Sequence, residues 1–185
     1  MASFALFGIS VSRGISIGRA HLIAHAAMDT KHYLVPQEKV EAEVERLQQA
    51  LSTVQKELET IWSNLPVDAP VELGAFLDVH AMILADSMIS KEPFNIIRTR
   101  RYNAEWALLT QIEELSAKFD HIEDPYLRER KADIQQVSER IMKVLTGTPT
   151  DYHPVSPESD SERVDMIVVA YDISPADMLQ FRDDT

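Results

Sequence analysis

The longest regular pattern in the sequence is a stripe of aliphatic residues between residues 36 and 64. Its members follow one another at alternating spacings of four and three: Val40, Val44, Leu47, Leu51, Val54, Leu58 and Ile61. This is the period of a helix that buries one face. Pro36 is tolerated in the first turn of a helix, whereas Asn64 and Pro66 favour its end. The pattern therefore predicts one long helix that needs helical neighbours to cover its stripe.

Further stretches carry a helical period and can supply those neighbours. They cover residues 71–90, a short continuation from Pro93, residues 104–119 and residues 124–146. Asp124 followed by Pro125 is a favourable helix start, and Gly147 is a favourable helix end. Residues 36–146 are therefore predicted to form one helical bundle with four main helices.

The two ends of the chain carry a different pattern. Short apolar runs and glycines in residues 4–23 predict a hairpin or a pair of strands. The run MIVVA at residues 166–170 predicts a buried strand. A new helix is predicted to begin at Ser174, because Ser is a good helix cap and Pro175 fits the first helical position. The proline-containing residues 148–163 predict a linker or a long loop.

The order of strand, helical bundle, strand and helix predicts an α+β chain in which a bundle is inserted into a partial α/β part. We assign residues 1–35 and 147–185 to the α/β part and residues 36–146 to the helical domain. About 20 residues at each end cannot cover both faces of a sheet, although MIVVA is typical of a strand buried on both faces. We therefore expect further sequence after Thr185. The alternative is a complete small domain with an exposed edge.

Composition narrows the class of protein. The 185-residue chain contains no cysteine, which excludes disulfides and thiolate metal sites. It has no run of about 18 apolar residues, and its amino terminus lacks the basic segment of a signal peptide, so we expect a cytoplasmic protein without a membrane span. A net charge of -12 argues against nucleic-acid binding. The same charge suits a small basic partner or solubility alone.

Four segments, taken in order, resemble one protein family. They are GISVSRGISIGRA at residues 8–20, FLDVHAMILAD at 76–86, DPYLRERKADI at 124–134 and VVAYDISP at 168–175. Each segment is weak alone, but four in this order over nearly the whole chain are specific. Together they resemble the amino-terminal part of Enzyme I of the bacterial phosphoenolpyruvate:sugar phosphotransferase system.

The resemblance implies a phosphotransferase of sugar uptake that takes a phosphoryl group from phosphoenolpyruvate onto a histidine and passes it to the small carrier protein HPr. It further implies that the bundle docks HPr and that the α/β part is a swivelling, phosphohistidine domain. The family's acceptor histidine lies in a G-G-x-T-S-H-x-A segment that this sequence lacks. Its phosphoenolpyruvate and magnesium site lies in a carboxy-terminal domain. We therefore expect a chain that is inactive alone and binds no cofactor, from an enzyme that uses Mg²⁺ and forms a homodimer.

The second predicted helix carries the candidate docking residues. A spacing of four places Asp78, Met82 and Asp86 on one helix face. Such a mixed acidic and apolar stripe would suit a basic partner with an apolar centre, and the resemblance implies that HPr or an HPr-like carrier docks there. Leu127 and Arg130 on the fourth helix would complete the surface. The alternative is that Met82 belongs to the core and the acids are merely solvated.

Several histidines and one serine are candidates for other roles. The resemblance allows His80 a place at the docking face, and the alternative is a partly buried histidine bonded to a neighbour. The spacings of His21, His25 and His32 would align on a helix, but their stretch predicts strand and loop, so no metal site is expected. Ser174 fits a helix cap and, as the resemblance implies, a hydroxyl that supports the missing acceptor histidine. No catalytic residue is assigned in this chain.

Two features keep the partner and the function open. Leu73 and Gly74 stand where a basic residue is common in the family, and residues 86–92 are less acidic than is usual there. Both an ordinary HPr and a paralogous carrier, as in nitrogen-linked systems, therefore stay open as the partner.

Two other functions are possible. One is the swivelling part of a related phosphoenolpyruvate-utilising enzyme, but such enzymes lack this helical insertion. The other is a helical protein-interaction module, which would not require the four ordered motifs.

Overall fold

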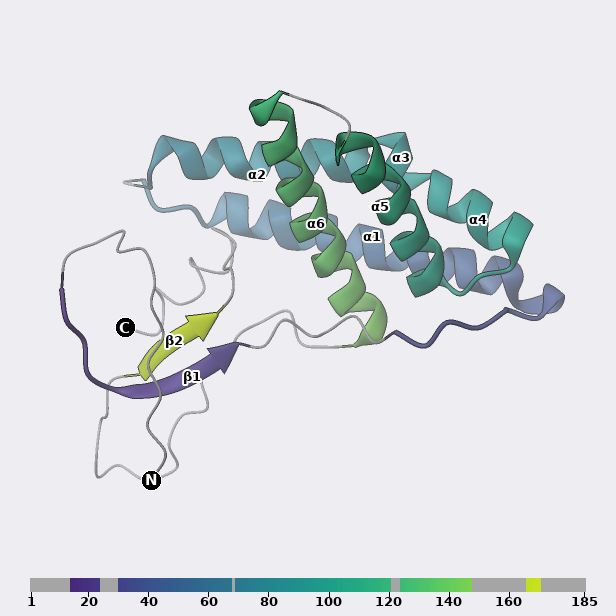
Figure 1. The fold of residues 1–185 in the computed structure, drawn as a ribbon, viewed down its shortest axis with the longest axis horizontal. Helices are drawn as coiled ribbons and strands as arrows, with labels where there is room; N and C mark the ends of the chain where they lie inside the picture. The colour runs from purple at the N-terminus through teal and green to yellow at the C-terminus, as the bar shows by residue number, and fades with distance from the viewer. Residues whose placement is uncertain (1–13, 24–29, 68, 121–123, 148–165, 171–185) are drawn as a thin grey trace. The chain divides into compact units, whose positions relative to one another are not determined.

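The computed structural model describes residues 14–23, 30–67, 69–120, 124–147 and 166–170. These residues divide into two compact units, one with two short strands and one with the helices (Figure 1). The strands are β1 (Arg19–Ile23) and β2 (Met166–Ala170). A single 3-10 turn, Gln37–Lys39, precedes the helices α1 (Val40–Ser63), α2 (Val71–Ala85), α3 (Ser87–Ser90), α4 (Glu92–Arg100), α5 (Ala104–Asp120) and α6 (Pro125–Thr146).

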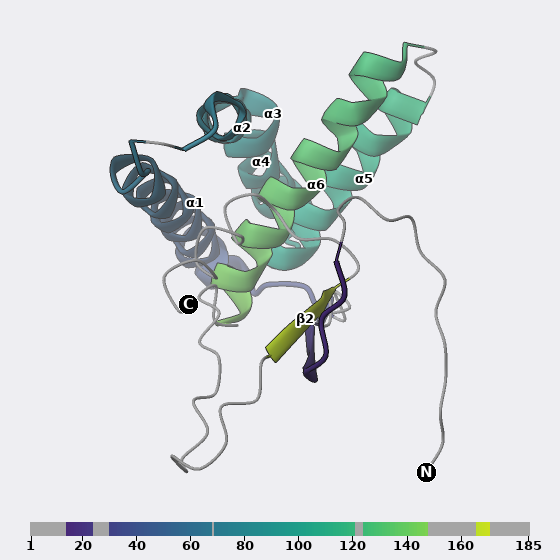
Figure 2. The same cartoon turned by 90° about the vertical axis from the view of Figure 1, so that its left-hand side faces the viewer.

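The aliphatic stripe of α1 lies in the interior of the helical unit, as the sequence predicts. Leu47 and Val54 are completely buried, and Ala50 is buried where the stripe predicts the half-buried Leu51. α1 packs against α2, α4, α5 and α6, and Figure 2 shows α5 and α6 running side by side. Pro36 begins the 3-10 turn, so the α-helix itself starts at Val40, slightly later than predicted. The helical bundle is confirmed.

The second predicted helix is interrupted where the sequence predicts that it continues. α2 ends at Ala85, and the chain bends by 55° into α3 and α4. The bend lies at Asp86, whose backbone is extended and whose carboxylate Oδ1 accepts a hydrogen bond from the Met88 amide at 2.7 Å. Aspartate is a strong helix cap, and here it starts a new helix rather than continuing the old one.

Among the residues that the structure describes, no single helix has the length and apolar character to span a membrane. One bent pair, α2 together with residues 87–100, meets this condition by length and composition alone.

The second unit is a parallel pair of strands. Arg19 lies opposite Met166 and Ile23 opposite Ala170, so segments on either side of the helical insertion come together. The strand predicted from MIVVA is thus confirmed, although Val169 is 37% exposed, which differs from burial on both faces. Residues 1–13 and the helix predicted from Ser174 lie outside the described residues, so the predicted hairpin and this helix stay predictions.

The end of α4 has an unusual backbone. Arg101 follows the helix with a φ of 56°, in the left-handed region. Its carbonyl accepts a hydrogen bond from the Val35 amide at 2.7 Å, which ties the segment before α1 to the end of α4. The left-handed conformation costs a residue with a side chain roughly 1–2 kcal/mol, a cost that glycine does not have.

We expect Arg101→Gly to leave the free energy of unfolding unchanged or to raise it by up to about 1 kcal/mol. Glycine removes the strain of the left-handed backbone, and this gain offsets the larger conformational entropy that glycine has in the unfolded state. The neighbouring control Arg100→Gly, inside the last helical turn, should lower it by about 1 kcal/mol. Urea unfolding of both variants tests this. An equal loss in the two variants would contradict the left-handed geometry at Arg101.

A largely buried carboxylate, Glu105, lies in the first turn of α5. It pairs with Arg46 of α1, and its Oε2 accepts a hydrogen bond from Asn103 Nδ2 at 2.6 Å. Burial alone would raise the pKa of Glu105. The hydrogen bonds from Arg46, from the backbone amide of Glu105 and from Asn103 outweigh burial and hold this pKa below its ordinary value.

Because the folded-state pKa of Glu105 is lowered, its stabilising effect is present above the unfolded-state pKa and is lost as the pH falls through the folded value. We expect Glu105→Gln to lower the free energy of unfolding by about 1–3 kcal/mol at neutral pH. The difference from the parent should shrink as the pH falls below the ordinary value of 4.5. Urea unfolding across this range measures it.

The matched control is Glu114→Gln, because Glu114 pairs with Arg100 at 3.8 Å and both side chains are half exposed. At neutral pH, Glu114→Gln should lower the free energy of unfolding by less than about 1 kcal/mol. A Glu105→Gln difference that stays constant or grows in acid would contradict the lowered pKa.

Candidate docking surface

α2 is apolar over most of its circumference, and its neighbours decide which positions are covered. Leu77, His80 and Leu84 are buried at spacings of three and four. Asp78 and Met82, one turn apart on another face, are exposed, and Met82 is 72% exposed. The alternative that placed Met82 in the core is therefore wrong.

Asp86 does not share the helix face that its spacing predicts. The spacing rule assumes a continuous helix, whereas α2 ends one residue earlier. The Asp86 carboxylate caps α3 and remains exposed. Asp86 therefore adds negative charge beyond the end of α2, but one of its oxygens already accepts the hydrogen bond from the Met88 amide.

His80 faces the interior rather than the docking face. It lies two residues from both Asp78 and Met82, which is about half a helical turn. Its side chain is 3% exposed, and its ring packs on Phe76 with 4.0 Å between the ring centroids. The structure thus differs from the expectation that His80 contacts a partner, because the neighbouring helices cover it.

The residues expected on the fourth helix lie in the first turns of α6. Arg130 is partly buried and forms an ion pair with Asp133 at 3.0 Å along the same helix. The side chain of Leu127 and all of Ser174 lie outside the described residues. Since α2 packs against α6, the two helices that carry the predicted docking residues are neighbours.

A groove of about 480 Å³ lies between the carboxy-terminal half of α1 and α2. Leu58 and Leu77 line its buried part, and Trp62 borders it with 47% of its side chain exposed. Glu59 from α1 and Asp78 from α2 bring carboxylates to its two sides. Asp78 therefore belongs both to the exposed face of α2 and to the groove.

Sequence reasoning did not find the α1 side of this groove. Glu59 and Trp62 lie outside the buried stripe of α1, and the period of the stripe does not tell which neighbouring helix approaches the other positions. The only signal was a tryptophan beside the stripe, which is ordinary at the end of a long helix.

Of the three histidines considered as metal ligands, the structure describes the side chain of His32 alone. His32 stacks on Trp106 with 5.1 Å between the ring centroids. The side chains of His21 and His25 lie outside the described residues. Within the described part of the chain, no three His, Asp or Glu side chains come together as metal ligands would.

Comparisons with known proteins add independent information. Residues 7–130 match the protein family described as PEP-utilising enzyme, N-terminal. The chain is 59% identical over 182 residues to the phosphoenolpyruvate-protein phosphotransferase of Cupriavidus necator, with 97% of this chain covered. It is 32% identical over 173 residues to the protein of the same name in Mycoplasma capricolum, with 94% covered. The chain spans only 31% and 29% of the length of these relatives.

Solved structures agree with the fold. An NMR solution structure of Enzyme I superposes with a TM-score of 0.71 at 27% identity, covering 91% of this chain and 66% of that one. The N-terminal domain of Enzyme 1-Nitrogen superposes with a TM-score of 0.65 at 24% identity, covering 90% of this chain and 65% of that one, a likeness of fold alone. By its match over residues 7–130, the chain belongs to the family of N-terminal domains of PEP-utilising enzymes, alongside phosphoenolpyruvate-protein phosphotransferases.

Proposed function

We propose that this chain is the carrier-docking part of a phosphoenolpyruvate-protein phosphotransferase. Residues 36–146 would bind HPr or an HPr-like carrier, and residues 1–35 and 147–185 would belong to the swivelling part. In the whole cytoplasmic enzyme, a phosphoryl group would pass from phosphoenolpyruvate, with Mg²⁺, to a histidine and then to the carrier. The observation that carries the proposal is Met82, which is exposed beside Asp78 on α2 in a chain of this family.

Phosphoryl transfer between two histidines needs both imidazoles in line with one phosphoryl group, and little other chemistry from the protein. Positioning of the carrier is therefore the main task of a docking domain. An exposed methionine is well suited to the centre of such a contact because its flexible, polarizable side chain adapts to a partner's surface. The carboxylates of Asp78 and Asp86 and the net charge of -12 would attract a carrier with a basic patch.

Met82→Ala should weaken carrier binding by about 1–3 kcal/mol, as expected for an apolar contact at an interface centre. The same change should alter the free energy of unfolding by only about 0.5 kcal/mol, because the side chain is exposed. Asp78→Asn should weaken carrier binding by about 1 kcal/mol or less, and this loss of binding should become smaller as salt is added. Calorimetric titration with HPr and with any paralogous carrier from the same organism measures these losses.

A suitable control is Ile17→Ala, since Ile17 is equally apolar, 88% exposed and part of the strand unit. It should leave carrier affinity unchanged. Absence of binding at millimolar carrier and low salt would contradict docking. Equal losses from Met82→Ala and Asp78→Asn would contradict the claim that the apolar contact dominates.

The chain alone should accept no phosphoryl group from phosphoenolpyruvate. The sequence lacks the G-G-x-T-S-H-x-A segment that holds the acceptor histidine in the family it resembles. Incubation with labelled phosphoenolpyruvate and Mg²⁺, followed by analysis of acid-labile label, tests this expectation. Stable labelling of any of its six histidines would contradict it.

A further inference from the structure

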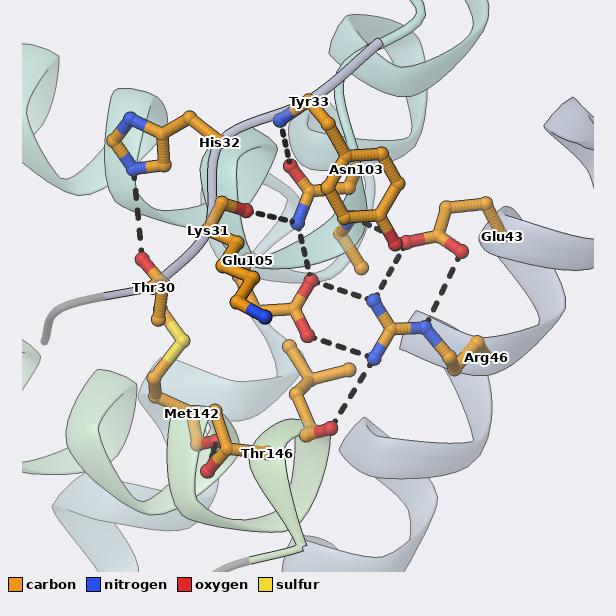
Figure 3. A network of polar contacts seen from close by, with 12 residues as sticks. Thr30, Lys31, His32, Tyr33, Glu43, Arg46, Asn103, Glu105, Met142 and Thr146 are labelled. Carbon is orange, nitrogen blue, oxygen red and sulfur yellow. Dashed lines mark hydrogen bonds and ion pairs between the residues drawn. The ribbon is translucent and has the colours of Figure 1, made fainter. Parts of the chain in front are cut away.

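Between the described strands and helices, the chain passes from one unit to the other before α1 and again after α6. We call residues 30–35, which lead into the helical unit, the incoming crossing. We call residues 144–147, where the chain leaves α6, the outgoing crossing. Figure 3 shows polar contacts that connect both crossings to Arg46 of α1. We call Arg46, Glu43, Asn103 and Glu105 the Arg46 cluster.

Arg46 contacts the outgoing crossing directly. Its Nη1 donates a hydrogen bond to the carbonyl oxygen of Leu145 at 3.2 Å and another to Glu105 Oε1 at 2.8 Å. The Leu145 carbonyl is in the last turn of α6, where carbonyl groups have no partner within the helix. Arg46 therefore caps the carboxy-terminal end of α6 from another helix.

Arg46 holds the incoming crossing through Glu105 and Asn103. The Asn103 side chain is almost completely buried, and its Nδ2 donates to Glu105 at 2.6 Å and to the Lys31 carbonyl at 3.1 Å. Its Oδ1 accepts a hydrogen bond from the Tyr33 amide at 3.3 Å. One buried amide thus binds the backbone of the crossing at two residues, and Glu105 fixes its orientation.

Glu43 completes the cluster from α1. Its carboxylate accepts hydrogen bonds from Arg46 Nη2 at 2.6 Å and Nε at 3.3 Å, and from the Ala104 amide at 2.7 Å. The side chains of Glu43 and Glu105 are each only 12% exposed. The hydrogen bond with Glu105 outweighs burial and raises the pKa of Arg46 above its ordinary value. The guanidinium group is required here, because a lysine ammonium cannot serve two carboxylates and a carbonyl in this planar arrangement.

We propose that Arg46 is a shared anchor of both crossings, so that the incoming and outgoing segments are released together when the Arg46 guanidinium group is removed. The anchor sets where each tether between the two units begins. Release of both segments would lengthen both tethers and lower the effective concentration of one unit at the other. The inference goes beyond carrier docking and does not depend on it.

The test is amide hydrogen exchange of the whole chain without any carrier. In Arg46→Met, we expect exchange at Tyr33 in the incoming crossing and at Gly147 in the outgoing crossing to accelerate by about tenfold or more. In Asn103→Ala, only the incoming crossing should accelerate, because the contact between Arg46 and Leu145 does not use that side chain.

The matched control is Arg98→Met. Arg98 also pairs bidentately with a carboxylate of α1, Glu41, with both distances at 2.9 Å, but this pair is exposed and touches neither crossing. Protection of Leu108, which is completely buried, reports whether each variant stays folded. If Arg46→Met does not fold, Arg46→Lys replaces it with the same readout. In the Arg46 variant, acceleration at only one crossing or at neither would overturn the shared anchor, as would equal acceleration in Arg98→Met. Acceleration at both crossings in the Arg46 variant but not in Arg98→Met supports it.

Discussion

Burial of the aliphatic stripe of α1 is the constraint on which the rest of the helical unit depends. The stripe is too long and too apolar to stay in water, and α2, α4, α5 and α6 all contact the helix that carries it. The other faces of α1 are then available for contacts outside the core. Arg46 near its beginning bonds the outgoing crossing directly and the incoming crossing through Glu105 and Asn103. Trp62 near its end borders the groove against α2. One helix thus organises the core, the attachment of the crossings and one side of the candidate docking region.

Sequence periodicity predicted the helices that bury one face in the core and expose the other to solvent. It located α1, α5 and α6, because burial of one face leaves a regular signal, whereas β2 was located by its continuous apolar run. It did not predict the bend at Asp86, where capping by a side chain competes with helix continuation. It also could not assign the faces of α2, since an apolar helix carries no contrast between the exposed Met82 and the covered His80. Arg46 bonds Glu105, which is 59 positions away in the sequence, and Leu145, which is 99 positions away, and no local pattern reaches so far.

The family resemblance suggested α2 as the candidate docking helix, but the structure is needed to separate its side chains by role. Asp78 and Met82 are exposed, whereas His80 is buried in the interior. Asp86 is exposed, and one of its carboxylate oxygens caps α3. The chain spans about a third of its relatives, so the phosphoryl transfer itself is a proposal about a longer protein. What this chain contributes to that proposal is a helical unit with a buried core and an exposed methionine, Met82, near the Asp78 carboxylate.

The most direct test of the central claim is a methyl NMR experiment on the complex. The chain has seven methionines, so selective labelling of their methyl groups gives a simple spectrum in which Met82 can be compared with the buried Met142. In a complex saturated with the unlabelled carrier, our account predicts intermolecular nuclear Overhauser effects from the Met82 methyl group and none from Met142. Their absence at Met82 in a saturated complex, with contacts from other methionines instead, would contradict docking on α2.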